Sequence, residues 1–313
     1  MVITVTLNPA MDKTLTIDNF NRGIVNRATS LRCDIGGKGI NVSKVLKNLE
    51  IDSICTGFLG GALEDTFIEE FRKREIKSEF IHIAGETRIN TKIVDNINKL
   101  FTDINEKGPE ISPKELETFI NKFTLMCKRD DIVVLSGGVP PGVPNDIYST
   151  LTKIARKKAA IVIMDADGEL LREGIEGHPD IIKPNENELS NFFKEQISND
   201  NDTIKAADRL RRLGIDKVLV SQGGKGAILL TEKSTYQANA IKTCVKSTVG
   251  AGDSMVAALV YSQIHKYDQK KTLEFAIACG AASVAIEGTG ACTLEQVNTI
   301  LNSNKIEIKE VIY

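Results

Sequence analysis

The chain has few of the residues that build metal centres and redox sites. Only three of its 313 residues are histidine (His82, His178 and His265), and no two of them have the spacing of a metal-binding pair. The six cysteines are scattered, and no C-x-x-C pair occurs. Such cysteines are typical of free thiols buried in a protein of the reducing cytoplasm. The sequence therefore predicts no zinc site, and it favours a cytoplasmic location.

Long apolar runs and an excess of one charge are also missing. No run is long enough to span a membrane, and Met1–Pro9 lacks the basic start and the small-residue cleavage site of a signal peptide. Lys and Arg together number 40 and Asp and Glu 42, which gives a net charge of −2. We therefore expect neither a nucleic acid nor a membrane surface among the partners.

Two nucleotide-binding fingerprints do not occur. The phosphate-loop pattern G-x-x-x-x-G-K-[ST] is absent from the chain, and no G-x-G-x-x-G follows the first expected strand, Val2–Leu7. The second absence argues against a dinucleotide-dependent oxidoreductase. That class stays an alternative, which a titration with NADH would test.

Apolar strands and amphipathic helices alternate along most of the chain. The capping box Ser112-Pro113-Lys114-Glu115, for example, predicts the start of a helix. Repeated strand–helix units predict an α/β fold with a mostly parallel central sheet and helices on both faces. Two pairs of half-exposed strands, at about 12–34 and 87–105, interrupt the alternation. We expect them to form a small β lid over the carboxyl edge of the sheet, within a single domain of residues 1–313.

The stretch Ser247–Ser254 joins a glycine-containing loop to an apolar helix. Gly250, Ala251 and Gly252 are expected at the helix N-terminus, where unpaired backbone N–H groups and the helix dipole favour anions. Asp253 adds a carboxylate beside that anion, as expected of a base that acts on a nucleophile attacking a phosphoryl group. The alternative is an ordinary helix start with an acidic first turn.

Two further stretches combine polar residues with a helix start. In Gly36–Asn41 the glycines allow close backbone approach, Lys38 supplies a charge and Asn41 can bond hydroxyl groups. The alternative is a helix start that needs flexible entry. In Lys183–Glu188, Asn185 and Glu188 lie three apart and could hold waters on Mg²⁺. The alternative there is an N-capped acidic first turn.

Three weaker signals complete the set. Ser221–Gly226 is rich in glycine and is either a hairpin turn or a loop along the phosphates of a nucleotide. Arg88 is a natural bidentate partner of a phosphate or carboxylate, although a single surface arginine is usually just solvated. Asp12, after the Asn8-Pro9 turn, could hold two sugar hydroxyls.

Taken in this order, the motifs resemble the ribokinase-like (PfkB-type) carbohydrate kinase family over essentially the whole chain. Gly36–Asn41 is similar to the N-terminal signature of the family and Val249–Ser254 to its C-terminal signature, while Asn185-x-x-Glu188 is similar to its magnesium-linked motif. The resemblance implies a three-layer α/β/α fold with a small β-sheet lid. It also implies ATP as co-substrate and Mg²⁺ as cofactor.

The resemblance assigns a role to each candidate residue. Asp253 is implied to be the base, and the amides of Gly250, Ala251 and Gly252 the anion hole. The residues implied to bind ATP are Lys183, Asn185, Ser221, Gly223 and Gly226. Glu188, with Asn185, is implied to act on Mg²⁺ through water. The residues implied to hold the sugar are Asp12, Gly37, Lys38, Asn41, Arg88, Asn90 and Ser136.

Within the family, four stretches are most similar to the kinases of phosphosugars, and Arg88 would bind the phosphate already on the substrate. These stretches are Thr4–Asp12, Gly85–Asn90, Gly108–Glu110 and Ser136–Gly142. The implied reaction transfers phosphate from ATP to the C6 hydroxyl of D-fructose 1-phosphate. Tagatose 6-phosphate and fructose 6-phosphate are alternative acceptors. Gly138 and Ala166-Asp167 depart from the usual residues, which are serine and Thr-Ser.

Three further expectations concern the ionisation of Asp253, the oligomeric state and an alternative function. The helix dipole should favour the ionised form of Asp253. Exposed lid strands leave an edge that must be paired or protected, so we expect lid-to-lid packing in a homodimer. A catalytically idle relative that senses sugar phosphates remains an alternative to a kinase.

Overall fold

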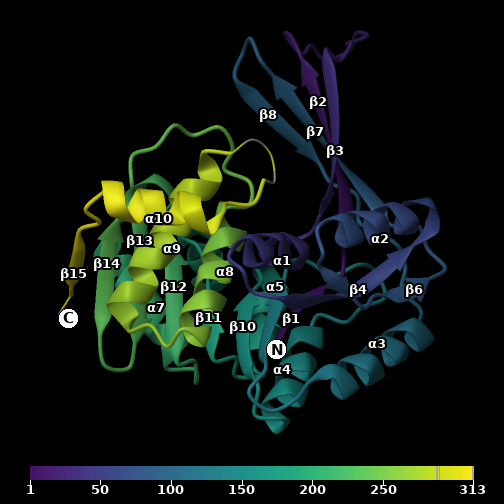
Figure 1. The fold of residues 1–313 in the computed structure, drawn as a ribbon. Coiled ribbons are helices and arrows are strands. Elements are labelled where there is room, and N and C mark those ends of the chain that lie inside the picture. The colour runs from purple at the N-terminus through teal and green to yellow at the C-terminus, as the bar shows by residue number, and fades with distance from the viewer. Residues whose placement is uncertain (287, 289, 312–313) are drawn as a thin grey trace.

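The computed structural model describes residues 1–286, 288 and 290–311. These residues form a large sheet with helices on both faces and a separate four-stranded sheet that projects from one end of the molecule (Figure 1). None of the helices described is long and apolar enough to cross a membrane.

The centre of the large sheet is parallel, as predicted. Strand β1 (Val2–Thr6) pairs with β4 (Ser53–Gly60) on one side and with β9 (Ile132–Ser136) on the other. The parallel strands continue from β9 through β10 (Ile161–Asp165) and β11 (Ile181–Ile182) to β12 (Lys217–Ser221). Antiparallel strands extend that edge: β13 (Gly226–Thr231), β14 (Thr235–Asn239) and β15 (Ile308–Glu310). Short strands β5 (Lys77–Ser78) and β6 (Ile81–Ile83) pair with β4.

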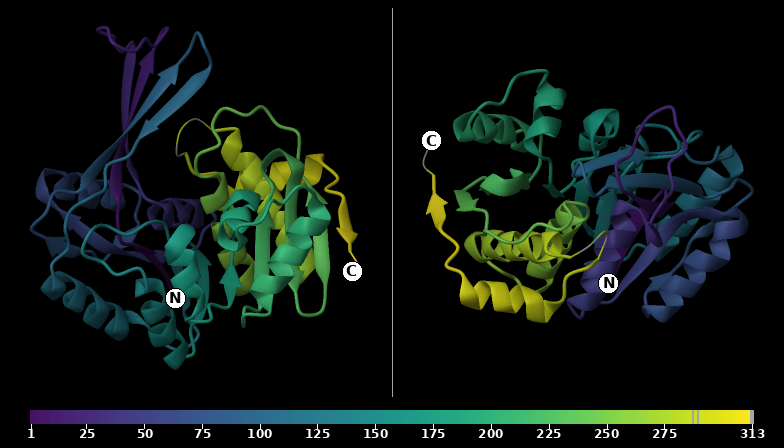
Figure 2. Two further views of the ribbon diagram at one scale, coloured as in Figure 1. Left: turned by 180° about the vertical axis from the view of Figure 1, so that it is seen from behind. Right: turned by 90° about the horizontal axis from the view of Figure 1, so that it is seen from above.

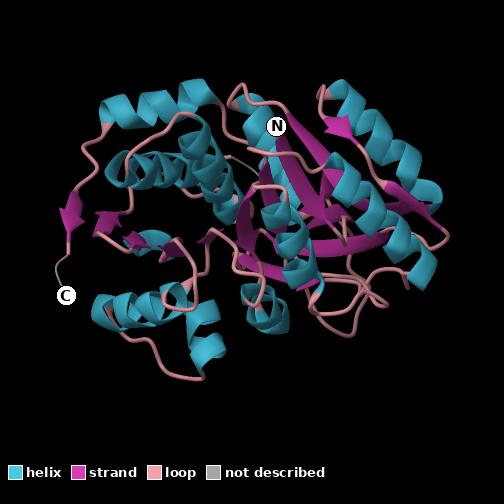
Figure 3. Cartoon of the chain, turned by 90° about the horizontal axis from the view of Figure 1, so that it is seen from below, coloured by secondary structure: helices cyan, strands magenta, loops and turns pink. Residues whose placement is uncertain are grey.

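Two helical layers cover the sheet because successive strand side chains point to opposite faces. Val133 and Leu135 of β9 belong to one core, while Ile132 and Val134 belong to the other. The first core includes α3 (Pro113–Met126), α4 (Ile147–Lys157), α5 (Gly168–Ile175), α6 (Glu186–Phe193) and α7 (Asp200–Arg211). The second includes α1 (Lys38–Asn48), α8 (Ala251–Ile264), α9 (Gln269–Val284) and α10 (Leu294–Ser303). Figure 3 shows both layers from below.

Helix α2 (Glu64–Lys73) packs at the lid end of the molecule. Its Phe67 and Phe71 join a third, smaller core with Met11 and Ile35, which come from lid strands. The large sheet and the base of the lid are therefore connected by packed apolar side chains.

The strands expected to form a lid do form a second sheet. Its order is β3-β2-β7-β8, with bounds Ser30–Gly36, Ala10–Ile17, Arg88–Asp95 and Leu100–Ile104. Strand β2 pairs in parallel with β7, from Ala10 opposite Arg88 to Ile17 opposite Asp95. The sheet stands clear of the helical layers in the views from the front and from behind (Figures 1 and 2).

The structure confirms some of the helices and strands predicted from local sequence patterns and contradicts others. The capping box at Ser112 is confirmed, since its Oγ accepts a hydrogen bond from the N–H of Glu115. The helix expected from Pro144 begins only at Ile147, and α5, β14 and β15 were not expected at all. All six cysteines are free. Cys33 and Cys244 are exposed, so the expectation that the thiols are buried is wrong for these two.

Candidate active site

Helix α8 starts at the glycine-containing turn from which the sequence predicts it to start. Its N-cap, Gly250, is left-handed with φ 84°, a conformation that a residue with a side chain rarely adopts. No side chain in the described residues caps this end of α8. The N–H groups of the first turn therefore present the positive end of a 14-residue helix to a ligand.

Asp253 lies in that first turn and is buried, with 6% of its surface exposed. Its Oδ2 accepts a hydrogen bond of 2.9 Å from Nδ2 of Asn41. Burial, with a contribution from the Asp165 carboxylate, raises the pKa of Asp253 to about 6, although Asn41, Lys38 and Lys183 pull it down. Desolvation thus opposes the helix dipole, which was expected to favour the ionised form, and raises the pKa above its usual value. A pKa near neutrality suits a general base.

Asp165, which was not among the predicted site residues, holds the lysines of the site. It ends β10, and its Oδ1 lies 3.3 Å from Nζ of Lys183 and 3.5 Å from Nζ of Lys38. Burial raises the pKa of Asp165, but the two ammonium groups outweigh it and leave the pKa below the usual value. The signal that could have identified Asp165 is an acidic residue at the carboxyl end of a buried parallel strand.

The start of α6 is an N-capping box, which confirms one of the two interpretations of Asn185 and Glu188. Oδ1 of Asn185 accepts from the N–H of Glu188 at 2.9 Å, and Oε2 of Glu188 accepts from the N–H of Asn185 at 3.0 Å. No hydrogen bond to Oε1 of Glu188 occurs in the described part of the chain, so this oxygen stays available to a cation. Burial raises the pKa of Glu188, and Lys183 partly offsets that effect.

The donor set near Glu188 fits Mg²⁺ that arrives with a ligand. Nowhere in residues 1–286, 288 and 290–311 do three or more His, Cys, Asp or Glu side chains form a group able to hold a metal. Mg²⁺ prefers oxygen ligands, retains several waters and is often bound through one or two carboxylates together with substrate phosphates. Glu188 therefore supplies what such an ion needs from the protein.

The loop at 221–226 lies next to the capping box. Ser221 forms a parallel β-bridge with Asn185, which brings the two stretches together. Gly223 has φ 56°, and a Cβ placed there would meet nothing within 4 Å, so its surroundings are open. Gly226, with φ 121°, starts β13, and a Cβ there would collide with the carbonyl oxygen of Ala238. The sheet itself therefore accounts for the glycine at 226, while Ser221 and Gly223 remain free to line a ligand.

Three of the predicted sugar-binding residues gather at the base of the lid. Nδ2 of Asn90 donates to Oδ1 of Asp12 at 3.2 Å, and burial raises the pKa of Asp12. The guanidinium of Arg88 donates to the carbonyl oxygens of Asn8 at 3.0 Å and Glu106 at 2.7 Å. Arg88 forms no ion pair with any carboxylate of the described residues, so its charge is available to an anionic ligand.

The other predicted sugar-binding residues lie nearer to Asp253. Lys38 contacts Asp165, and Asn41 contacts Asp253. Gly37 is the N-cap of α1 and has φ 127°. Ser136 pairs with Asp165 across β9 and β10, and its buried Oγ has no hydrogen-bond partner in the part of the chain described. The start of α1 thus joins the Asp253 cluster to the base of the lid.

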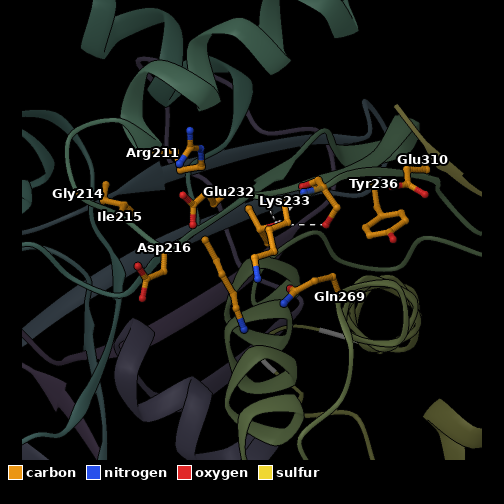
Figure 4. Close-up of a pocket in the computed structure, with 12 residues that line it drawn as sticks. Arg211, Gly214, Ile215, Asp216, Glu232, Lys233, Tyr236, Gln269 and Glu310 are labelled. Atoms are coloured by element: carbon orange, nitrogen blue, oxygen red, sulfur yellow. Dashed lines mark hydrogen bonds between the residues drawn. The ribbon is translucent and has the colours of Figure 1, made fainter. Parts of the chain in front are cut away.

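A surface cavity of about 740 Å³ lies at the opposite edge of the sheet. Its lining includes Lys217. Lys233 and Tyr236, which also line it, are labelled in Figure 4. Lys217 begins β12, whereas Ser221 ends it beside Asn185. None of the candidate site residues lines this cavity.

The whole chain is similar to known carbohydrate kinases. The family model for "pfkB family carbohydrate kinase" matches residues 5–296. Tagatose-6-phosphate kinase from Staphylococcus epidermidis is 34% identical over 314 residues, covering 99% of this chain and 100% of the relative. 1-Phosphofructokinase from Bacillus subtilis is 33% identical over 306 residues, covering 98% and 99%. The crystal structure of phosphofructokinase-2 from Escherichia coli superposes with a TM-score of 0.91 at 25% identity, covering 96% of this chain and 98% of the other.

These findings confirm the fold and the resemblance inferred from the motifs. The large, mostly parallel sheet with helices on both faces and a smaller second sheet is the ribokinase-like architecture. With a family match over residues 5–296 and relatives more than 30% identical over nearly its full length, the chain belongs to the pfkB family of carbohydrate kinases.

Proposed function

We propose that the protein transfers the γ-phosphoryl group of ATP to the C6 hydroxyl of D-fructose 1-phosphate in the cytoplasm, giving D-fructose 1,6-bisphosphate and ADP. The observation that carries the kinase chemistry is the buried Asp253, whose pKa is raised to about 6, at the open N-terminus of α8. A curated 1-phosphofructokinase at 33% identity supports the acceptor sugar. Tagatose 6-phosphate is the second candidate, because a tagatose-6-phosphate kinase is equally similar.

Asp253 acts as the base for the acceptor hydroxyl. Its Oδ2 is held by Asn41, and Oδ1 has no hydrogen-bond donor among the described residues, so the proton goes to Oδ1. A pKa of about 6 leaves the carboxylate mostly ionised at neutral pH but more basic than an ordinary aspartate. Proton transfer then accompanies attack of the hydroxyl oxygen on phosphorus.

The charge that develops during transfer is bound by backbone N–H groups and lysines. The amides of Gly250, Ala251 and Gly252 form the anion hole, where fixed dipoles need no rearrangement. A Cβ on Gly252 would lie 3.3 Å from Nζ of Lys183, so this ammonium group stands at the mouth of the hole. Asp165 keeps Lys183 and Lys38 beside each other.

ATP is proposed to lie along Lys183, Asn185, Ser221, Gly223 and the Gly226 turn. Mg²⁺ bound to the nucleotide would neutralise phosphate charge, and Glu188, next to Asn185, would hold it through water. Arg88, Asn90 and Asp12 at the base of the lid, with Gly37, Lys38, Asn41 and Ser136, would hold the sugar phosphate. Closure of the lid over the sugar would exclude water, which limits wasteful hydrolysis of ATP.

The test is ADP release from the purified protein with ATP-Mg²⁺ and one sugar at a time: fructose 1-phosphate, tagatose 6-phosphate, fructose 6-phosphate, fructose and ribose. We expect the highest kcat/KM with fructose 1-phosphate. A clear preference for tagatose 6-phosphate would establish the second candidate, and a preference for an unphosphorylated sugar would refute the role of Arg88. Tight sugar-phosphate binding without any turnover would identify a sensor.

The lid is proposed to pack against the lid of a second copy of the chain. Apolar side chains are unusually exposed on it; Val25 (77%), Ile24 (66%), Phe101 (64%), Leu100 (61%) and Leu31 (59%) are examples. Strands β3 and β8 are its two edges, and exposed apolar edges pair readily.

We expect a dimer at micromolar concentration in sedimentation velocity, and a monomer after Phe101→Glu. Leu125→Glu, at an 81% exposed site on α3 outside the lid, is the matched control and should remain dimeric. A wild-type monomer would refute the proposal.

A further inference from the structure

Lys44 is a buried lysine near the active site to which no role has been assigned. Only 4% of its surface is exposed, and it forms no ion pair with a carboxylate of the described residues. Burying a charged group is costly unless the group is paired and hydrogen-bonded, so such a residue calls for an explanation. The ionisable groups that face Lys44 are Arg74, Asp34, Asp12 and Cys55.

The Lys44 ammonium group is held by two oxygen atoms. It donates to the backbone carbonyl of Ile35, near the end of lid strand β3, and to Oδ1 of Asn41 at 3.4 Å. Asn41 and Lys44 are three residues apart on α1, so their side chains lie on the same face of the helix. The ammonium group therefore connects the foot of the lid to Asn41.

The contact with Lys44 selects one orientation of the Asn41 amide. An asparagine side chain has an acceptor end and a donor end, and rotation by 180° exchanges them. Because Lys44 can only donate, it favours the orientation in which Oδ1 faces Lys44 and Nδ2 faces away. In that orientation Nδ2 donates to Oδ2 of Asp253 at 2.9 Å.

We propose that Lys44 is a positioning residue of the kinase, which fixes the orientation of the Asn41 amide and thereby holds Asp253 for proton abstraction. The hydrogen-bonded series runs from the carbonyl of Ile35 through Lys44 and Asn41 to Asp253. Lys44 itself touches no reacting atom. This inference rests on the proposed kinase activity and adds a residue outside the catalytic cluster to it.

A double-mutant cycle tests whether Lys44 acts through Asn41. The variants are Lys44→Met, Asn41→Leu and both together, with kcat and KM measured for ATP and fructose 1-phosphate. We expect Lys44→Met to lower kcat about tenfold with an unchanged KM for ATP, and Lys44→Arg, which keeps the donors, to restore most of the loss. The double variant should be no slower than Asn41→Leu alone. Lys47→Met, on the same helix but pairing with the exposed Asp52, is the matched control and should keep wild-type kcat.

The pKa of Asp253 gives a readout that does not depend on turnover. Carboxyl ¹³C NMR, with the signal assigned by Asp253→Asn, follows its titration in each variant. The charged groups that face Asp253 are Asp165, Lys38 and Lys183, and all of them remain in the cycle. Asn41→Leu should raise the pKa of Asp253 by about one unit, because a donor to the carboxylate is lost. Lys44→Met should raise it by less, and the double variant by no more than Asn41→Leu.

The outcomes separate this inference from the proposed function. The positioning role would be overturned if the two reductions in kcat multiplied in the double variant, or if Lys44→Met left the pKa of Asp253 unchanged. Neither result would contradict the proposed kinase activity. A wild-type protein that phosphorylates no sugar would refute the function, whereas the NMR cycle would still decide the role of Lys44. Should Lys44→Met fail to fold, Lys44→Gln takes its place in both cycles with the same expected results. Its shorter side chain stays polar but cannot reach both oxygens.

Discussion

Replacing Asp253 with asparagine should stabilise the folded protein at neutral pH. The pKa of Asp253 is raised from 3.8 to about 6, mainly by burial, so the folded state binds this proton more tightly than the unfolded state. The free energy of unfolding therefore falls as the pH rises from about 4 to about 6, and the loss persists at all higher pH. A neutral asparagine of the same shape avoids the cost of burying the charge.

The size of this gain follows from the size of the pKa shift. A shift of about two units corresponds to about 3 kcal/mol in the free energy of unfolding. The entropy of unfolding is about 2.1 cal/mol/K per residue, so for a protein of this length about 3 kcal/mol raises Tm by about 5 °C. The same substitution removes the proposed base, and kcat should fall by about 10² to 10⁴ while ATP binding stays near normal.

Thermal unfolding at pH 7.5 and pH 5, together with steady-state kinetics, measures both effects. At pH 5 about half of the stability gain should remain, because the folded wild type is then already protonated. Asp65→Asn is the matched control, since Asp65 also lies in the first turn of a helix but is exposed. It should change the free energy of unfolding by a few tenths of a kcal/mol at most. An Asp253→Asn variant with unchanged or lower Tm at pH 7.5, or a gain equal at both pH values, would refute the argument. A variant that keeps more than half of the wild-type activity would refute the assignment of the base.

Two further substitutions test the groups around Asp253. Asp165→Asn leaves Lys38 and Lys183 without their shared carboxylate and should lower the free energy of unfolding by about 3 kcal/mol, measured by urea denaturation. It should also move the acid limb of the pH–rate profile to lower pH, because the Asp165 charge helps to raise the pKa of Asp253; a shift to higher pH would contradict this. Arg88→Met should raise KM for fructose 1-phosphate by roughly 10- to 100-fold, since a charge-assisted contact with phosphate is lost. An equal rise in KM for ATP would show that Arg88 does not recognise the sugar phosphate.

Periodicity predicted most of the fold, because the central strands and helices carry their patterns in their own residues. The apolar run Ile132–Ser136 is buried on both faces, as a central parallel strand must be. Strand β14 was missed because Thr235–Asn239 is mostly polar and becomes a strand through its pairing with β13. Helix α5 was missed because it has only eight residues, begins with Gly168 and has no side-chain hydrogen bond from its N-cap, Asp167. Edge strands and short helices thus depend on contacts that a local pattern does not contain.

The candidate site also contains residues that a local pattern predicts and residues that only contacts between distant parts of the chain reveal. Glycine-containing turns at helix starts are local features, and both Gly250 and Gly37 have the positive φ that their positions require. Asp165 and Lys44 carry no local motif. Asp165 bonds to Lys38, which is 127 residues away in sequence, and the role proposed for Lys44 depends on a contact between Asn41 and Asp253 across 212 residues. Only the assembled fold shows that these charges lie together.

The raised pKa of Asp253 shows how burial sets the reactivity of the site. The dipole of α8 stabilises a negative charge by at most about 2 kcal/mol, whereas burial beside a second carboxylate opposes ionisation more strongly. Asp165 and Asp253 carry two negative charges, and Lys38 and Lys183 carry two positive ones, so these four side chains balance one another before any ligand binds. Phosphate oxygens bound at the α8 amides would add negative charge beside Asp253 and raise its proton affinity further. In the proposed reaction, Asp253 therefore becomes a stronger base when the phosphoryl donor is present, which is when the acceptor hydroxyl has to lose its proton.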